Sequence, residues 1–140
     1  MVEVARSVGS PVMSHSSPAP AARSLVIKTT SGLDRPEAAN QALTVAAAAV
    51  ASGVEVSLWL TGESAWFAVP GRAAELALEH AAPAGDLLDA VLAAGTVTLC
   101  TQCAARREIT ADDVLPGVRI AGAAVFAEEI LRPGAQALVY

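Results

Sequence analysis

The two cysteines of this 140-residue chain lie three positions apart, in the stretch Cys100-Thr101-Gln102-Cys103. They follow the apolar run 95–99, which predicts a buried strand, and the residues after them favour a helix. The thiolate is the reactive form of cysteine, and a helix start lowers a thiol pKa from about 8.5 to roughly 3.5–7.5. The spacing therefore predicts sulfur chemistry, the alternative being two small apolar side chains that fill the core.

The composition is that of a folded domain with little affinity for nucleic acid. Apolar residues make up 54% of the chain and charged residues 16%, which suits a full hydrophobic core and argues against intrinsic disorder. The formal net charge is −5, and the basic residues gather no further than the pair Arg106-Arg107. We therefore expect no nucleic-acid partner. The apolar runs fall short of the roughly 18 residues of a membrane span, so we expect no membrane partner.

The side chains that could hold a metal or cofactor are too few. Structural zinc sites use four ligands, whereas this chain offers two cysteines and two isolated histidines, His15 and His80. Neither a glycine-rich phosphate loop nor a Ser-His-Asp set is present. The sequence predicts neither a metal site nor a cofactor.

A change in composition near residue 23 predicts a tail followed by one domain. Residues 1–23 contain three prolines and a Ser-His-Ser-Ser run without apolar periodicity, which favours a flexible segment. They lack the basic start and apolar stretch of a secretory signal, so we expect a cytoplasmic protein. His15 lies in this tail and is expected to be a solvated residue. Residues 24–140 are expected to form the domain.

Strand and helix patterns alternate through the domain. The predicted strands are 24–30, 54–60, 96–99, 118–120 and 135–140, and the predicted helices follow Pro36, then cover 86–94, 101–107 and 123–131. Asp34 and Glu37 are placed to form a capping box on the first helix, which Gly53 ends. This alternation predicts a parallel sheet covered by helices on both faces. Functional loops gather at the carboxyl ends of such strands, where the two cysteines lie.

Other polar and aromatic side chains are expected to have structural roles. Trp66 and Phe67 suit a core or an interface better than a substrate pocket, and Glu63 suits a solvated or capping position. Arg106 and Arg107 suit a helix end more than a partner for a sulfur anion. The remaining candidates are His80, expected on a helix surface, and Asp112 and Asp113, expected in a turn or a helix cap.

Four segments in order resemble the DsrE/DsrF-like sulfur-relay family, which includes the YchN-like proteins. They are Thr29-Thr30-Ser31-Gly32-Leu33-Asp34-Arg35-Pro36, Gly53 to Glu63, Leu99 to Arg107, and Asp112 to Val118 leading to Gly122-Ala123. The resemblance spans residues 24–140. It implies a three-layer α/β/α sandwich with a five-stranded, mostly parallel sheet, and it implies a homo-oligomer.

The resemblance also implies a sulfur-carrying cysteine after the third strand, a position that Cys100 occupies. The family often has Arg-Gly where this chain has Arg107 and Glu108, so a position with a permissive backbone is lost here.

Three functions follow from the two thiols. In the first, Cys100 is a sulfurtransferase-like persulfide carrier, Cys103 is a resolving or protecting thiol, and a protein supplies or accepts the sulfur. In the second, Cys100 and Cys103 form a CxxC thiol-disulfide redox pair. In the third, the chain is a non-enzymatic subunit of an oligomer whose cysteines only pack. We favour the first.

Overall fold

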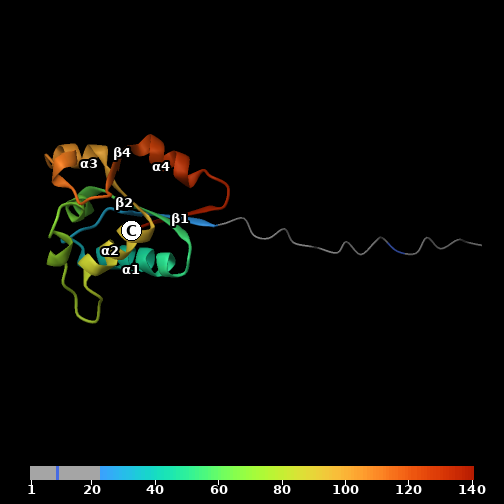
Figure 1. The fold of residues 1–140 in the computed structure, drawn as a ribbon, viewed down its shortest axis with the longest axis horizontal. Helices are drawn as coiled ribbons and strands as arrows, with labels where there is room; N and C mark the ends of the chain where they lie inside the picture. Colours follow the sequence, from blue (N-terminus) through green and yellow to red (C-terminus); the bar gives the residue numbers. More distant parts are fainter. Residues whose placement is uncertain (1–8, 10–22) are drawn as a thin grey trace, which may run out of the picture.

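Five parallel strands form a single sheet in the computed structural model, which describes residue 9 and residues 23–140 (Figure 1). The predicted tail 1–23, with His15, therefore lies almost entirely outside the described residues. The strands are β1 (Ser24–Thr29), β2 (Glu55–Leu60), β3 (Thr96–Cys100), β4 (Arg119–Ala121) and β5 (Ala135–Val139). The α-helices are α1 (Pro36–Ala51), α2 (Ala84–Ala94), α3 (Thr101–Arg106) and α4 (Ala123–Ile130). Three short 3-10 helices complete the domain: η1 (Gly62–Ala68), η2 (Ala73–Glu75) and η3 (Ala111–Asp113).

The strand order is β4-β3-β2-β1-β5, and each neighbouring pair is parallel. The chain moves in one direction from β1 to β3, and right-handed crossovers then place α1 and α2 on the same face. It returns from β4 across the whole sheet to β5, which places α4 on the opposite face (Figure 1). The predicted three-layer α/β/α sandwich is therefore confirmed, with a wholly parallel sheet.

The main core lies between the sheet and the helices α1 and α2. Along β2, Val56, Leu58 and Leu60 are fully buried in this core, and α1 meets the sheet through Leu43 and a row of buried alanines. Small side chains allow the helix to approach the strands closely, which explains the alanine-rich sequence of α1. The alternate residues of β2 face α4 instead, as the hydrogen bonds of Ser57 and Trp59 to that helix show.

The predicted capping box at the start of α1 is wrong. The residue before the helix is Arg35, and no side chain caps the helix start. The Asp34 carboxylate instead accepts a hydrogen bond from the backbone N–H of Gly32 at 2.8 Å, so it stabilises the loop after β1. Pro36 does open the helix, where its fixed φ and missing N–H are tolerated, and Gly53 follows the helix end with a φ of 79°.

His80 does not lie on a helix surface, as the sequence pattern had suggested. It lies in a turn between η2 and α2 and has a φ of 60°. Smaller differences concern strand ends: β4 is shifted by one residue toward the C-terminus, and β3 extends to include Cys100.

Candidate functional site

Cys100 is the last residue of β3 and lies directly before α3. Its side chain is half-buried and lines a cavity of about 70 Å³ on the α4 side of the sheet. The cavity is lined by Lys28, Trp59, Thr61, Cys100, Gln102, Ala123 and Phe126. The ends of β1, β2 and β3 and the start of α4 therefore meet around this thiol, at the sheet edge where the sequence predicts a site.

Two aromatic rings form the apolar wall of this cavity. Trp59 from β2 and Phe126 from α4 meet edge to face, with ring centroids 5.3 Å apart. The ammonium group of Lys28 lies 5.3 Å from the centroid of the Phe126 ring, within the range of a cation–π contact. The cavity thus combines one thiol, one cation and two aromatic rings.

The environment of Cys100 favours its thiolate. Partial burial opposes ionisation, but hydrogen bonds from the backbone N–H and the thiol of Cys103 and from the N–H of Gln102 outweigh it. The positive charge of Lys28 acts in the same direction. The pKa of Cys100 is therefore lower than the usual value for a thiol, which increases the population of the reactive form.

Cys103 lies in a different environment, although it is only three residues away. Its side chain belongs to the hydrophobic core, and its Sγ accepts a hydrogen bond from the backbone N–H of Gly62 at 3.1 Å. Burial raises the pKa of the Cys103 thiol most strongly, and the neighbouring Cys100 raises it further; the hydrogen bond from Gly62 and the charge of Arg107 lower it, but the net shift is upward. Cys103 is therefore held as a neutral thiol beside Cys100.

Gly62 is a residue of this site that the sequence analysis did not single out. Its φ is 51°, and a Cβ there would lie 2.6 Å from the carbonyl oxygen of Thr30, so only glycine fits. The hydroxyls of Thr61 and Ser64 donate to the carbonyl oxygen of Thr29 at 2.8 and 2.7 Å. These contacts fix the loop after β2 against the loop after β1 and direct the Gly62 N–H at Cys103.

Glu63 and Arg107, both considered from the sequence, form an ion pair with each other, and neither of them lines the Cys100 cavity. An Arg107 Nη donates to Glu63 at 2.8 Å, and the other donates to the carbonyl oxygen of Cys103 at 3.1 Å. Arg106 is exposed at the end of α3. Neither arginine lines the Cys100 cavity. The contacts of Arg107 join the end of α3 to η1.

Glu108 occupies the position where the resemblance calls for glycine, and its backbone explains that preference. Its φ of 56° lies in the left-handed region, directly after α3. The backbone N–H of Ile109 donates to the carbonyl oxygen of Ala104 at 3.0 Å, which closes the end of the helix. The chain therefore keeps the loop shape that glycine favours and accepts a strained glutamate.

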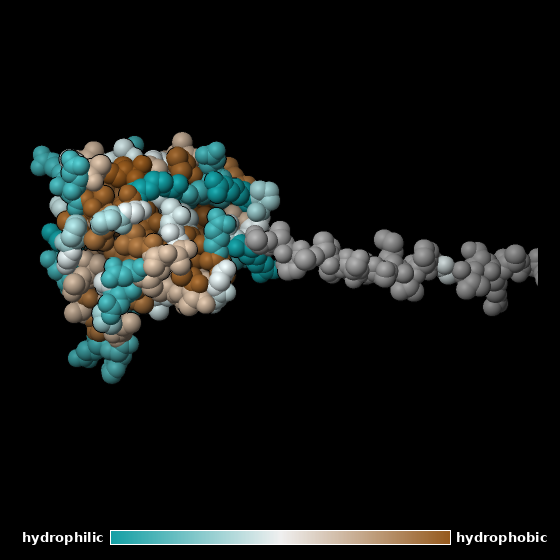
Figure 2. Space-filling view, viewed as in Figure 1, coloured by the Kyte–Doolittle hydropathy of each residue, from teal (hydrophilic) through white to brown (hydrophobic). Residues whose placement is uncertain are grey.

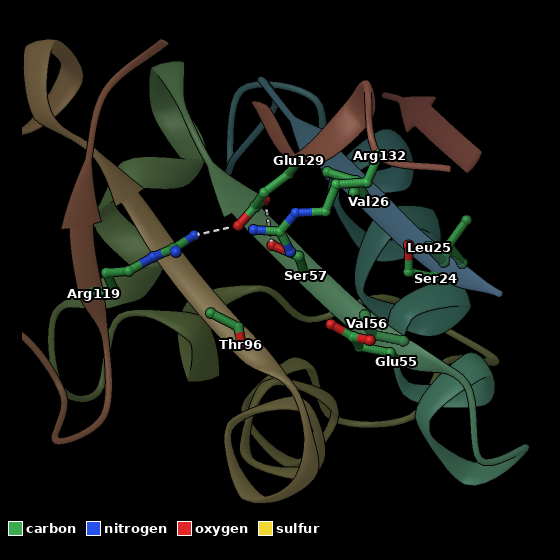
Figure 3. Close-up of a pocket in the computed structure, with 10 residues that line it drawn as sticks. All are labelled: Ser24, Leu25, Val26, Glu55, Val56, Ser57, Thr96, Arg119, Glu129 and Arg132. Atoms are coloured by element: carbon green, nitrogen blue, oxygen red, sulfur yellow. Dashed lines mark hydrogen bonds and ion pairs between the residues drawn. The ribbon is translucent and has the colours of Figure 1, made fainter. Parts of the chain in front are cut away.

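A buried carboxylate fixes α4 over the sheet. Glu129 accepts hydrogen bonds from Trp59 Nε1 at 2.7 Å and from the Ser57 hydroxyl at 2.8 Å. It also forms an ion pair with Arg119 at 2.7 Å (Figure 3). Burial opposes its ionisation, but these partners outweigh burial and hold the pKa of Glu129 below its usual value. The sequence pattern gave no indication of this network, because its members lie in three separate elements.

The Glu129 network borders a second cavity, of about 130 Å³, at the amino ends of the strands (Figure 3). Ser24, Glu55 and Thr96, the first residues of β1, β2 and β3, line it together with Arg132. This cavity lies at the opposite end of the strands from Cys100.

The other side chains considered from the sequence lie away from Cys100. Phe67 is buried in the core, and Trp66 is half-buried with the Arg72 guanidinium 4.7 Å from its ring centroid. Asp113 caps η3, as expected, by accepting hydrogen bonds from the N–H and hydroxyl of Thr110. Within residues 23–140, no group of three or more His, Cys, Asp or Glu side chains is placed to hold a metal ion.

The helices among the described residues are too short or too polar to cross a membrane.

A sequence model of the DsrE/DsrF-like family matches residues 23–139. The chain belongs to the DsrE/DsrF-like family. This membership supports a role related to sulfur relay in general, and it covers the whole sheet, both cysteines and α4. Comparison with curated proteins yields no match.

Two solved structures share the DsrE/DsrF-like fold of this chain. The ychN protein from E. coli is 20% identical, with a TM-score of 0.70 over 84% of this chain and 99% of that chain. The protein of unknown function MTH1491 from Methanobacterium thermoautotrophicum is 11% identical, with a TM-score of 0.61 over 84% of this chain and 98% of that one. At these identities the likeness concerns the fold alone.

Proposed function

We propose that this protein is a sulfur carrier in which Cys100 holds sulfane sulfur as a persulfide. The observation that carries the proposal is the contrast between the two thiols. Cys100 lines an open cavity and has a lowered pKa, whereas Cys103 is buried beside it with a raised pKa. Family membership supports the same class of chemistry.

Loading transfers one sulfur atom without net oxidation. The Cys100 thiolate attacks the terminal sulfur of a donor persulfide, a new S–S bond forms at Cys100, and the donor's S–S bond breaks. The donor leaves as a thiolate and takes the electron pair of the broken bond. Delivery repeats the same exchange with an acceptor thiolate, so we expect a donor protein, an acceptor protein or both as partners.

Cys103 is the resolving or protecting thiol in this proposal. As a resolving thiol, its thiolate attacks Sγ of Cys100, the terminal sulfur leaves as hydrosulfide, and a Cys100–Cys103 disulfide remains. The two cysteines are then oxidised, the released sulfur is reduced, and a dithiol reductant must reset the pair. As a protecting thiol, Cys103 stays reduced and stabilises the Cys100 thiolate through its hydrogen bond.

The second candidate function is thiol-disulfide exchange with a protein substrate. The observation that favours it is the hydrogen bond between the two thiols, because it brings both sulfur atoms close together. Such a pair cycles between dithiol and disulfide and never carries an extra sulfur atom.

Incubation with sodium polysulfide followed by intact-mass measurement separates these functions. A carrier gains one sulfur atom, about 32 Da, on Cys100. The variant Cys100→Ser should gain none, whereas Cys103→Ser should still load and should keep the adduct longer. An unchanged adduct in Cys100→Ser, or no adduct in Cys103→Ser, which cannot form the Cys100–Cys103 disulfide, would show that Cys100 is not a carrier.

A further inference from the structure

Lys28 is the one lysine of this chain, and its position in the fold is unusual for a lysine. It lies in β1, the second strand from the sheet edge, which pairs with β2 on one side and β5 on the other. Its side chain is half-buried and lines the Cys100 cavity. Lysines are mostly exposed, and a charge that is partly withdrawn from water requires a compensating partner.

The strand register brings Lys28 to the same face of the sheet as Cys100. Lys28 pairs with Trp59 of β2, and Trp59 pairs with Thr98 of β3. Cys100 follows Thr98 by two residues, so its side chain points to the same face of the sheet. The ammonium group and the thiol therefore share one cavity, although the two residues are 72 positions apart in the sequence.

Lys28 forms no ion pair with any of residues 23–140. Its ammonium group lies over the Phe126 ring, and Cys100 is the one side chain lining the cavity that readily becomes an anion. The carboxylate of Glu129 lies behind Trp59 and is already paired with Arg119. The charge of Lys28 is thus available to an anion at Cys100.

Apart from Lys28, the polar side chains that line the cavity have few hydrogen-bond donors free for a ligand. The Thr61 hydroxyl donates to the carbonyl oxygen of Thr29, and Trp59 Nε1 donates to Glu129. Lys28 and the amide of Gln102 remain. A sulfur oxyanion carries two or three oxygens that each need donors, whereas a perthiolate is a compact, polarisable monoanion that tolerates aromatic walls.

We propose that Lys28 is the counter-ion of an anionic sulfur at Cys100, and that the cavity selects a perthiolate or hydrosulfide over a sulfur oxyanion. The proposal rests on the carrier function, since it names the substrate class of that site. The cavity of about 70 Å³ has room for a few atoms beyond the Cys100 thiol. Lys28 is a positioning residue: its ammonium group stabilises the negative charge of the sulfur on Cys100 until an acceptor thiolate takes that sulfur.

The first test measures the alkylation rate of Cys100 against pH by peptide mapping, with neutral iodoacetamide and anionic iodoacetate. Lys28→Met should raise the pH midpoint by about half a unit or more, which lowers the rate below the midpoint about threefold or more. It should also lower the ratio of the iodoacetate rate to the iodoacetamide rate. Lys28→Arg should restore both, because it restores the charge.

Arg132→Met is the matched control, because it removes one exposed positive charge at the opposite end of the strands. It should behave as the wild-type protein. A Lys28→Met variant with unchanged midpoint and unchanged rate ratio would overturn the proposal. If Lys28→Met folds poorly, the wild-type protein is alkylated at increasing concentrations of sodium chloride instead. The ratio of the iodoacetate rate to the iodoacetamide rate should then fall, because salt screens the charge of Lys28. A constant ratio would overturn the proposal.

The second test addresses the class of ligand. Polysulfide loading of Cys100 at pH 7 should fall about threefold or more in Lys28→Met and recover in Lys28→Arg. Sodium sulfate should protect Cys100 from iodoacetamide no better than sodium chloride at the same ionic strength, and specific protection by sulfate would overturn the selection against oxyanions. If neither the wild-type protein nor any variant loads sulfur, the proposed carrier function is wrong. The pH profile of Cys100 alkylation then still tests separately whether Lys28 pairs with the Cys100 thiolate.

Discussion

At the scale of single residues, the two cysteines share a short motif but differ in their surroundings. Cys100 is the last residue of β3, and its side chain lines a cavity. Cys103 lies about one helical turn later in α3, and its side chain is buried in the core. The N–H of Gly62 and the thiol of Cys100 surround Cys103 on two sides. This contrast is the reason that we propose Cys100 as the reactive thiol and Cys103 as the supporting one.

The hydrogen bond from Cys103 to Cys100 leads to a prediction about a matched pair of variants. Cys103→Ser keeps an O–H donor toward Cys100, whereas Cys103→Ala removes the donor. Because this hydrogen bond lowers the pKa of Cys100, Cys103→Ala should raise the pH midpoint of Cys100 alkylation, and Cys103→Ser should raise it less. If both variants match the wild-type profile, Cys103 does not act through this hydrogen bond.

Glu108 leads to a prediction about stability. Its φ of 56° costs a side-chain-bearing residue roughly 1 kcal/mol that glycine does not lose. Glu108→Gly should therefore raise the free energy of unfolding by up to about 1 kcal/mol, measured by denaturant titration. Glu108→Ala, which keeps a Cβ, serves as the control and should give no such gain. A destabilised Glu108→Gly protein would contradict this account of the loop.

At the scale of elements, α4 is the helix that completes the Cys100 cavity, and it is a short one. It spans eight residues, and Glu129 is its single fully buried side chain. The ion pair with Arg119 and the hydrogen bonds from Trp59 and Ser57 hold this helix against the sheet. These contacts place Phe126, one turn before Glu129, and Ala123, nearly two turns before it, at the cavity.

Removing the charge of Glu129 should therefore destabilise the domain. Glu129→Gln should lower the free energy of unfolding at pH 7 by about 1–3 kcal/mol, because the buried side chain at position 129 loses its charged hydrogen bonds and half-exposed Arg119 loses its ionic partner. Glu128→Gln, an exposed change on the same helix, should have little effect. Thermal unfolding of both variants measures the difference.

The pH dependence of that difference follows from the lowered pKa of Glu129. A carboxyl whose pKa is lower in the folded state adds stability above its unfolded pKa, and this stability is lost as the pH falls through the folded pKa. The gap between wild type and Glu129→Gln should therefore be full near pH 7 and should shrink below about pH 4. A gap that stays constant down to pH 3 would contradict an ionised Glu129.

Most elements could be predicted from the sequence, because their patterns are local. The alternation of strands with helices predicts a parallel sheet covered on both faces, and the family resemblance adds the five strands and the three-layer sandwich. The capping role of Asp34 was predicted wrongly, since a short carboxylate can also bind a backbone N–H of its own loop, here that of Gly32. The helical setting of His80 was wrong, because the chain turns between η2 and α2 and the φ of 60° at His80 lies outside the helical region.

The remaining features of the site depend on how distant strands are ordered. Cys100 was found from its motif, but Lys28, Trp59 and Phe126 lie in other elements. These side chains come together because of the register between β1, β2 and β3, and that register cannot be read from the sequence. The alternation of side chains along β1 assigns Lys28 to one of the two faces of the sheet. The strand order and register are needed to show that Cys100 lies on the same face.

At the scale of the whole molecule, apolar side chains remain at the surface between hydrophilic ones (Figure 2). Among the described residues, four large apolar side chains are exposed, and three of them, Leu131, Leu138 and Val139, lie in the segment that ends the chain. β5, which belongs to this segment, is an edge strand that pairs with β1 alone. Such a surface favours contact with a second copy.

We therefore predict a homo-oligomer that uses this segment. Light scattering at micromolar concentration should give a multiple of the 14.1 kDa chain mass. Leu131→Glu should lower that mass, whereas Leu33→Glu, at the fourth exposed apolar position, should leave it unchanged. The mass of a single chain for the wild-type protein would contradict the prediction.

Cys100 and Cys103 should differ in reactivity if Cys100 is the sulfur carrier, and limited alkylation at pH 7 measures that difference. A substoichiometric amount of iodoacetamide is followed by peptide mapping, with cleavage or fragmentation between the two cysteines. The pKa of Cys100 is lowered and that of Cys103 is raised, so the label should be found predominantly on Cys100. Equal labelling of the two thiols, or faster labelling of Cys103, would contradict the assignment of Cys100 as the sulfur carrier.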